Sequence, residues 1–188
     1  MKRISILTII SVVTFSLTAF NPIPEKRVSS KAHIKFFSTT PVEDIEANNY
    51  KIVSTIDPNS GEIVFSVPMQ SFEFEKALMQ KHFNQNGFLD TKNHPKAKFK
   101  GEITNLSDIN WEEDGVYNAN ITGDLTIKGV TKTYNEEGTI VVSGNTLNIN
   151  ATFDVTLADH GIAFVKGKPS TNIAKTVEVT LTAEYQPQ

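Results

Sequence analysis

The side chains that could carry out acid–base or metal chemistry are few in this sequence, and their spacing is unfavourable. The chain has no cysteine, and its four histidines are His33, His82, His94 and His160. No two of them have the His-x-x-x-His spacing of a helical metal site, and no thiolate is available to complete a zinc site. The sequence therefore predicts no metal site, no disulfide and no cysteine nucleophile.

The adjacent pair Asp159 and His160 is the combination that most suggests general acid–base catalysis. Nucleophilic catalysis by such a pair needs a serine or similar group presented at a sharp turn, and no serine here lies in a recognisable motif of that kind. Asp90 is in a polar segment and is better explained as a turn residue. We expect no catalytic residues, and hence no enzyme.

His82 and a row of lysines each allow two interpretations. His82 could be a polar contact for a ligand head group or a half-buried histidine bonded to a backbone carbonyl, and we favour the second. The lysines are Lys92, Lys96, Lys98 and Lys100. Such a row is usually a solvated strand face, but it could also meet a pyrophosphate head group or make transient contact with an anionic membrane.

Composition and the N-terminus indicate a single exported domain. The 188 residues carry a net charge of −3 and no basic cluster, which argues against a nucleic-acid partner. Lys2 and Arg3 precede an apolar run that ends at Phe20, and prolines follow, which is typical of a secretory signal peptide. We predict a signal peptide at 1–20 and one domain at 21–188, periplasmic or secreted. An uncleaved membrane anchor is the alternative.

One aromatic stretch, Ser71–Gly101, interrupts a chain that otherwise alternates between apolar and polar residues. Within it, a helical period predicts a short amphipathic helix at about 74–84. Its apolar rows are Phe74, Leu78 and His82, and beside them Met79 and Phe83. A helix this short is marginal by itself, so it must dock on an apolar surface.

Segments with a period of two on both sides of this stretch predict eight strands. Alternation continues from Val116 to Val130, longer than a typical strand, which favours a sheet that coils into a barrel. The predicted fold class is mainly β, an eight-stranded antiparallel β-barrel with one short amphipathic helix. Residues Pro41–Asn49 are expected to form a loop. The predicted strands are Ser30–Thr39, Tyr50–Ile56, Glu62–Met69, Ala97–Thr104, Val116–Val130, Thr131–Ser143, Thr146–Leu157 and Thr176–Tyr185.

Many residues predicted to face inward are small, and this has two explanations. They could open space along the barrel axis, or they could make room for the rings of Phe65, Phe99 and Phe153. An exported barrel with an apolar interior under an amphipathic helix suits a lipid carrier, because each CH₂ group of a ligand that is buried contributes about 0.8 kcal/mol to the free energy of binding. A filled barrel acting as a structural or protein-interaction module is the alternative. The small residues are Ala97, Gly101, Ala119, Gly123, Gly129, Ala151 and Ala183.

Three motifs resemble those of the YceI-like family. The first runs from Phe65 to Phe99, the second is Gly123–Lys132, and the third and weakest is Phe153–Ile162, where His160 replaces the usual aromatic residue. The resemblance implies an extended lipocalin-like barrel of the bacterial periplasm or exterior that binds polyisoprenoids or isoprenoid quinones. It implies no cofactor beyond such a bound isoprenoid lipid or quinone.

We therefore predict a binding site for an apolar small molecule of isoprenoid or fatty acyl type, with the aromatic stretch at its entrance. The predicted ligand-binding residues are Phe36, Phe65, Met69, Phe72, Phe74, Leu78, Met79, His82, Phe83, Phe88, Phe99, Ala119, Ile121, Gly123 and Phe153.

Overall fold

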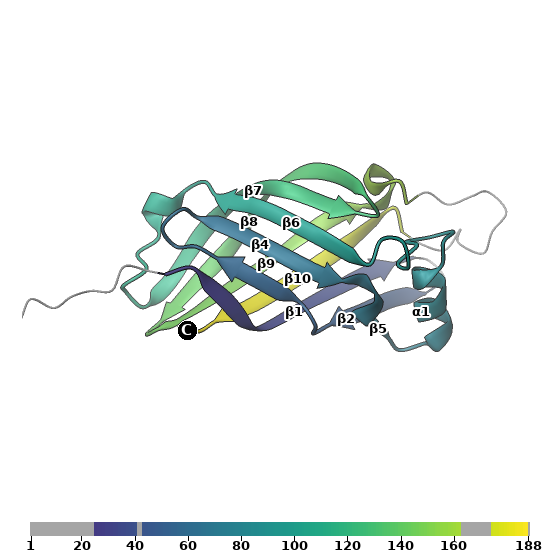
Figure 1. The fold of residues 1–188 in the computed structure, drawn as a ribbon, viewed down its shortest axis with the longest axis horizontal. Coiled ribbons are helices and arrows are strands. Elements are labelled where there is room, and N and C mark those ends of the chain that lie inside the picture. Colours follow the sequence, from purple (N-terminus) through teal and green to yellow (C-terminus); the bar gives the residue numbers. More distant parts are fainter. Residues whose placement is uncertain (1–24, 41–42, 163–173, 188) are drawn as a thin grey trace, which may run out of the picture.

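The computed structural model describes residues 25–40, 43–162 and 174–187, which form an elongated antiparallel β-barrel (Figure 1). The predicted signal peptide lies outside these residues. The strands are β1 (Arg27–Thr39), β2 (Asp44–Asn49), β3 (Val53–Ile56), β4 (Glu62–Pro68), β5 (Glu73–Phe74), β6 (Lys96–Ile103), β7 (Gly115–Ile127), β8 (Val130–Ser143), β9 (Thr146–Thr156) and β10 (Thr176–Tyr185). The helix α1 is Ala77–Asn84, and the 3-10 turns are η1 (Met69–Ser71), η2 (Leu106–Asp108) and η3 (Leu157–His160).

Pairing between the first and last strands closes the sheet. The strand order is β10-β9-β8-β7-β6-β4-β3-β1-β2-β5, and β10 also pairs with β1. Because β3 pairs with the start of β1 and β2 with its end, these two short strands share one position in the barrel. The two-residue strand β5 only extends the edge of β2. The result is a closed eight-stranded barrel with one helix, so the predicted fold class is confirmed.

The segment before Tyr50 was expected to be a loop, and this expectation is wrong. Asp44–Asn49 is strand β2, and Ala47 is fully buried although the segment is mostly polar. The predicted strand Tyr50–Ile56 begins only at Val53. Asn49 explains the interruption, because its side chain donates to the Pro68 carbonyl at 2.9 Å and accepts from the Lys51 amide at 2.9 Å.

The helix is shorter than predicted, and a different face of it is buried. Residues Glu73 and Phe74 pair with β2 as strand β5, so the helix starts at Ala77. Since Phe74 is in a strand, the predicted apolar row through Leu78 and His82 is wrong: Leu78 is 62% exposed. Phe83 is the buried residue of the helix.

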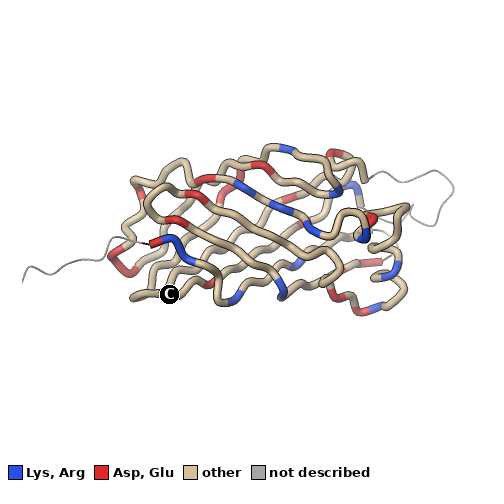
Figure 2. The backbone as a smooth tube through the Cα atoms, in the orientation of Figure 1, with Lys and Arg blue, Asp and Glu red and all other residues tan. Residues whose placement is uncertain are grey.

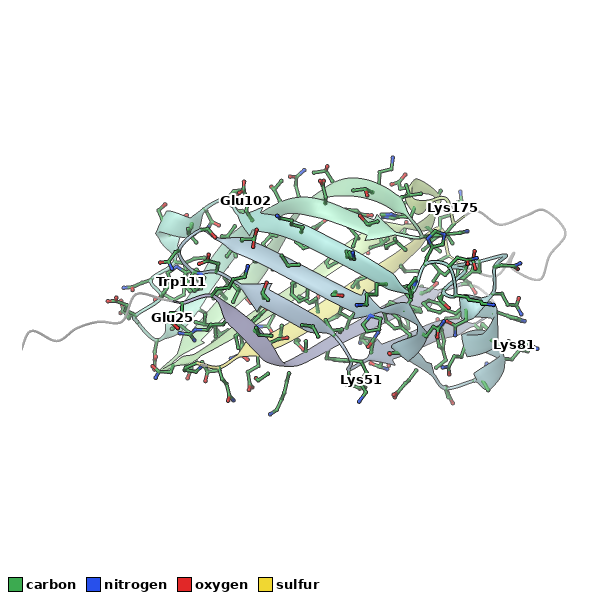
Figure 3. The ribbon with its side chains drawn as sticks, in the orientation of Figure 1. Glu25, Lys51, Lys81, Glu102, Trp111 and Lys175 are labelled. Carbon is green, nitrogen blue, oxygen red and sulfur yellow. The ribbon has the colours of Figure 1, made fainter. Side chains whose placement is uncertain are left out.

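The end of the barrel away from α1 is filled with side chains. Tyr185 and Ile140 are fully buried there, and Trp111 packs against the core at the same end, opposite Lys81 of the helix (Figure 3). The Tyr185 hydroxyl is hydrogen-bonded to the hydroxyl of Ser54 on β3, and burial raises the pKa of Tyr185 well above its usual range. The bond therefore joins neutral hydroxyls where β3, β1 and β10 meet.

Two small inward residues make room for a ring and open no space. Gly101 and Gly123 are paired across β6 and β7. A Cβ at Gly123 would lie 2.5 Å from the Gly101 Cα and 2.5 Å from Cζ of Phe99. The ring of Phe99 thus occupies the place of the missing side chains. Gly129 does not face inward, because it forms the β7–β8 turn with Lys128, both at positive φ.

Replacing Gly123 with alanine is therefore expected to destabilise the protein by about 1–3 kcal/mol, the usual cost of overpacking. Urea unfolding monitored by circular dichroism measures this cost. Asn120→Ala, at an exposed position of the same strand, is the control and should lie within about 0.5 kcal/mol of wild type. If the Gly123→Ala variant is as stable as wild type, the space beside Gly123 is open.

Candidate ligand-binding cavity

A cavity of about 450 Å³ occupies the half of the barrel beneath α1. Its volume falls in the range of small-molecule sites, about 300–1,000 Å³. The wall consists mainly of apolar side chains from the strands that surround it. Apart from the predicted residues treated below, the apolar lining residues are Ile34, Ile45, Ile63, Val67, Leu89, Leu125, Ile127, Ile149, Ala151, Val155, Leu157, Ile162, Val177, Val179 and Leu181.

A cluster of phenylalanine rings holds the helix over this cavity. The ring of Phe83 from α1 lies 5.7 Å from Phe36, 5.5 Å from Phe72 and 5.1 Å from Phe74, measured between centroids. Phe88, after the helix, lies 6.4 Å from Phe83. Such pairs contribute about 0.5–1.5 kcal/mol each beyond the burial of their area. Because α1 has eight residues and is marginal alone, this cluster determines its position.

The structure brings most of the predicted ligand-binding residues together around the cavity, although their role in binding stays a prediction. The predicted residues that line it are Phe36, Phe65, Met69, Phe72, Phe74, Met79, His82, Phe83, Phe88, Phe99, Ile121 and Phe153.

Three predicted residues do not line the cavity. Leu78 is on the outer face of α1 and is exposed to solvent. Ala119 is buried and paired with Gly138, two residues from Ile140 on β8, and it does not reach the cavity. Gly123 is covered by the ring of Phe99. The structure therefore does not place these three residues on the cavity wall. Ala119 and Gly123 were included because small inward residues could have opened space, and Leu78 because the helical row was counted from Phe74.

Sequence reasoning missed the polar residues that line the cavity, which are Ser38, Glu43, Gln85, Asn86, Lys98, Tyr134 and Glu136. Ser38 follows Phe36 by two residues on β1, and residues two apart on a strand point to the same face. The inward direction of Ser38 could therefore have been predicted from that of Phe36. Glu136 gave no such signal, because a carboxylate on a strand is ordinarily expected to face water. Burial, and secondarily the charge of Asp154, raises the pKa of Glu136.

The strands β8 and β9 separate along one side of the cavity. Their paired residues run only from Gly138–Ala151 to the Ser143–Thr146 pair. Beyond Gly138, Tyr134 and Glu136 of β8 and Phe153 of β9 line the cavity without a ladder between the two strands. Side chains therefore form this part of the wall.

His160 bridges this separation. It is fully buried, its Nδ1 lies 3.1 Å from the Val130 carbonyl oxygen, and its Nε2 lies 3.0 Å from the Tyr134 hydroxyl. Since a carbonyl only accepts, Nδ1 carries a hydrogen. Both ring nitrogens of His160 are thus engaged in holding η3 against β8. The histidine has a structural explanation that involves no acid–base role with Asp159.

The rim of the cavity carries charged and polar side chains. His82 is exposed there, so the expectation of a half-buried histidine is wrong. Lys76, just before α1, donates to Glu43 at 3.0 Å and so links the helix to the segment that precedes β2. Asp90 is a turn residue, as predicted, because its carbonyl oxygen accepts from the amides of Asn93 and His94.

Three lysines of the predicted row follow the outside of β6, where they form a line of positive charge (Figure 2), and the fourth, Lys92, lies in the turn before this strand. Lys96, Lys98 and Lys100 are exposed, and the Lys100 ammonium lies 3.3 Å from the Glu62 carboxylate. Their exposure agrees with a solvated strand face.

Within the described residues, no group of three or more His, Asp or Glu side chains could hold a metal ion. No helix in the same part of the chain has the length and apolarity needed to cross a membrane.

A closed antiparallel barrel with an apolar cavity under a helix is the architecture of a small-molecule-binding barrel. The model of the YceI-like domain matches residues 24–185, so the chain belongs to the YceI-like family. A UPF0312 protein of Pseudomonas putida (strain W619) is 32% identical over 133 residues, which are 68% of this chain and 63% of that protein. The chain thus matches less than two thirds of the length of this curated relative.

Solved structures share the fold at low sequence identity. A polyisoprenoid-binding domain from Saccharophagus degradans, implicated in plant cell wall breakdown, has a TM-score of 0.71 at 11% identity, covering 87% of this chain and 98% of its own. Burkholderia cenocepacia BcnA has a TM-score of 0.66 at 18% identity, covering 81% of this chain and 95% of its own.

Glu136 gives a prediction about pH. Because the pKa of Glu136 is raised on folding, the native state binds its proton more tightly than the unfolded chain does. The stability associated with this proton is present below the unfolded pKa of about 4.3 and is lost as the pH rises through the folded pKa. Glu136→Gln should therefore match wild type at about pH 3 and exceed it at pH 7.

The expected gain in Tm at pH 7 is about 1–2 °C, or about 0.5 kcal/mol, since water screens a half-exposed carboxylate. Differential scanning calorimetry at both pH values measures it. Glu137→Gln, at the exposed neighbouring position on β8, serves as the control and should show no pH-dependent gain. A Glu136→Gln protein less stable than wild type at pH 7 would contradict the assignment.

Proposed function

We propose that this protein is an exported carrier that binds an apolar chain of isoprenoid type in the cavity under α1 and performs no covalent chemistry on it. The observation that supports this most is the contrast between the two ends of one barrel. Tyr185, Ile140 and Leu147 fill the far end, whereas a cavity of about 450 Å³ is left at the helix end.

The energetics favour an apolar occupant. Apolar side chains make up most of the wall, so a hydrocarbon that enters it leaves water without losing hydrogen bonds. Each methylene transferred contributes about 0.8 kcal/mol, and a chain of ten or more methylenes could bind tightly without polar contacts. The fold shared with a polyisoprenoid-binding domain supports an isoprenoid over other apolar chains.

The filled end offers some support for a purely structural barrel. In that case, the phenylalanine rings around Phe83 would be a plug that completes the core. The rings line the cavity wall without filling it, however, and this favours the carrier. Contact of the rim with a membrane during loading would suit a carrier of lipid.

The carrier is tested by purifying the protein without detergent, extracting it with organic solvent and identifying lipids by mass spectrometry. Ala151 lines the cavity and the next residue, Thr152, is exposed on the outside of β9. Ala151→Phe should lose about tenfold in affinity for an isoprenoid alcohol, because the ring displaces about two methylenes. Thr152→Phe should bind as wild type does.

The carrier proposal fails if the wild-type protein yields no lipid and also binds no isoprenoid or fatty acyl probe in titrations. Equal lipid content in wild type and Ala151→Phe would place the lipid elsewhere than in the cavity.

Export after removal of residues 1–20 is part of the proposal, supported by the sequence of the N-terminus. Expressed from its full coding sequence in a Gram-negative host, the protein should be recovered from the periplasm with an N-terminus near residue 21. N-terminal sequencing decides this, and recovery of the intact N-terminus would contradict cleavage.

A further inference from the structure

Ser38 differs from the other buried polar residues in the described part of the chain. Asn49, Ser54, Thr91 and His160 all make side-chain hydrogen bonds, and none of these four lines the cavity. Ser38 is 3% exposed, lines the cavity, and its Oγ has no hydrogen-bond partner among the described residues. A buried hydroxyl without a partner destabilises a fold, so it calls for an explanation.

The position of Ser38 on β1 puts its hydroxyl on the cavity side. Ile34, Phe36 and Ser38 alternate along β1, and all three line the cavity. The residue paired with Ser38 on β2 is Ile45, which also lines it. An apolar side chain would suit these neighbours better, yet the sequence places a hydroxyl here.

We propose that the Ser38 hydroxyl binds the polar group of the carried ligand, which is an apolar chain ending in an uncharged oxygen, either a hydroxyl or a carbonyl. A serine hydroxyl both donates and accepts, so it suits either. Among the described residues that line the cavity, the charged ones are Glu43, Glu136 and Lys98. Glu43 is paired with Lys76 just outside, so this lining offers a single lysine and no cluster of cations for an anionic head group such as a phosphate. The inference rests on the proposed carrier function and adds the ligand's polar end to it.

This contact also orients the ligand. Ser38 is near the end of β1 that adjoins β2, β5 and α1, whereas Ile34 is four residues deeper in the barrel (Figure 1). Four residues of strand span about 13 Å. The polar end of the ligand therefore lies near the rim, and its chain extends inward toward Ile34 and Leu181, which are paired on β1 and β10.

The test compares 1-dodecanol with dodecane, each titrated as a competitor of a fluorescent fatty acyl probe. Ser38→Ala should bind dodecanol about fivefold more weakly than wild type, or about 1 kcal/mol, the contribution of one hydrogen bond. It should bind dodecane as wild type does, and the unliganded variant should melt no lower. Ser66→Ala, on the outer side of β4, is the control and should change neither affinity.

The outcomes separate the two proposals. Suppose that wild type binds both compounds. If Ser38→Ala binds each of them as wild type does, or loses the same affinity for both, the role of Ser38 is overturned and the carrier proposal stands. Binding of dodecyl phosphate more tightly than dodecanol would overturn the uncharged head group. If wild type binds none of these compounds, the carrier proposal itself fails.

Discussion

The pairing of β1 with β10 is the constraint on which the rest of this structure depends. It joins strands from opposite ends of the described chain and turns an open sheet into a closed wall. A closed antiparallel sheet has one face that is shut off from water, so every inward residue must be packed, paired or in contact with a ligand. Tyr185 reinforces the closure through its hydrogen bond to Ser54.

The two halves of the barrel meet this requirement differently. At the far end, large side chains such as Tyr185 and Leu147 are buried and complete a packed core. The ring of Phe99, lying over Gly101 and Gly123, marks the change between the halves. Beyond it, mainly apolar side chains line a cavity, and α1 covers this end of the barrel through Phe83. The cavity therefore exists because no large side chains fill this end of the barrel and because aromatic contacts hold the helix above it.

Strong alternation made much of the fold predictable. The strand Thr176–Tyr185 was predicted with its observed bounds, because apolar and polar residues alternate along its whole length. The strand β2 escaped prediction because only one of its inward residues, Ile45, is large and apolar, whereas Ala47 is small and Asn49 is polar. The start of α1 was misplaced because the apolar residue Phe74 fits the pattern of a strand as well as that of a helix.

The site was predictable only in its apolar part. Aromatic residues near the helix were expected at the cavity, and they line it. A charged residue inside a barrel gives no such signal, because a carboxylate on a strand is ordinarily expected to face water; Glu136 was missed for this reason. Gly123 was expected at the cavity because of its small size, but the three-dimensional packing puts the ring of Phe99 in the space beside it.

The most direct test of the account is a crystal structure with a long-chain alcohol that carries bromine on its terminal carbon. Anomalous scattering locates the bromine independently of any interpretation of the rest of the ligand. The account predicts a single bromine peak inside the barrel, on the cavity floor among Ile63, Ile149 and Leu181. A peak on the outer surface, or a structure in which the phenylalanine rings have collapsed into the cavity and no ligand is bound, would contradict it.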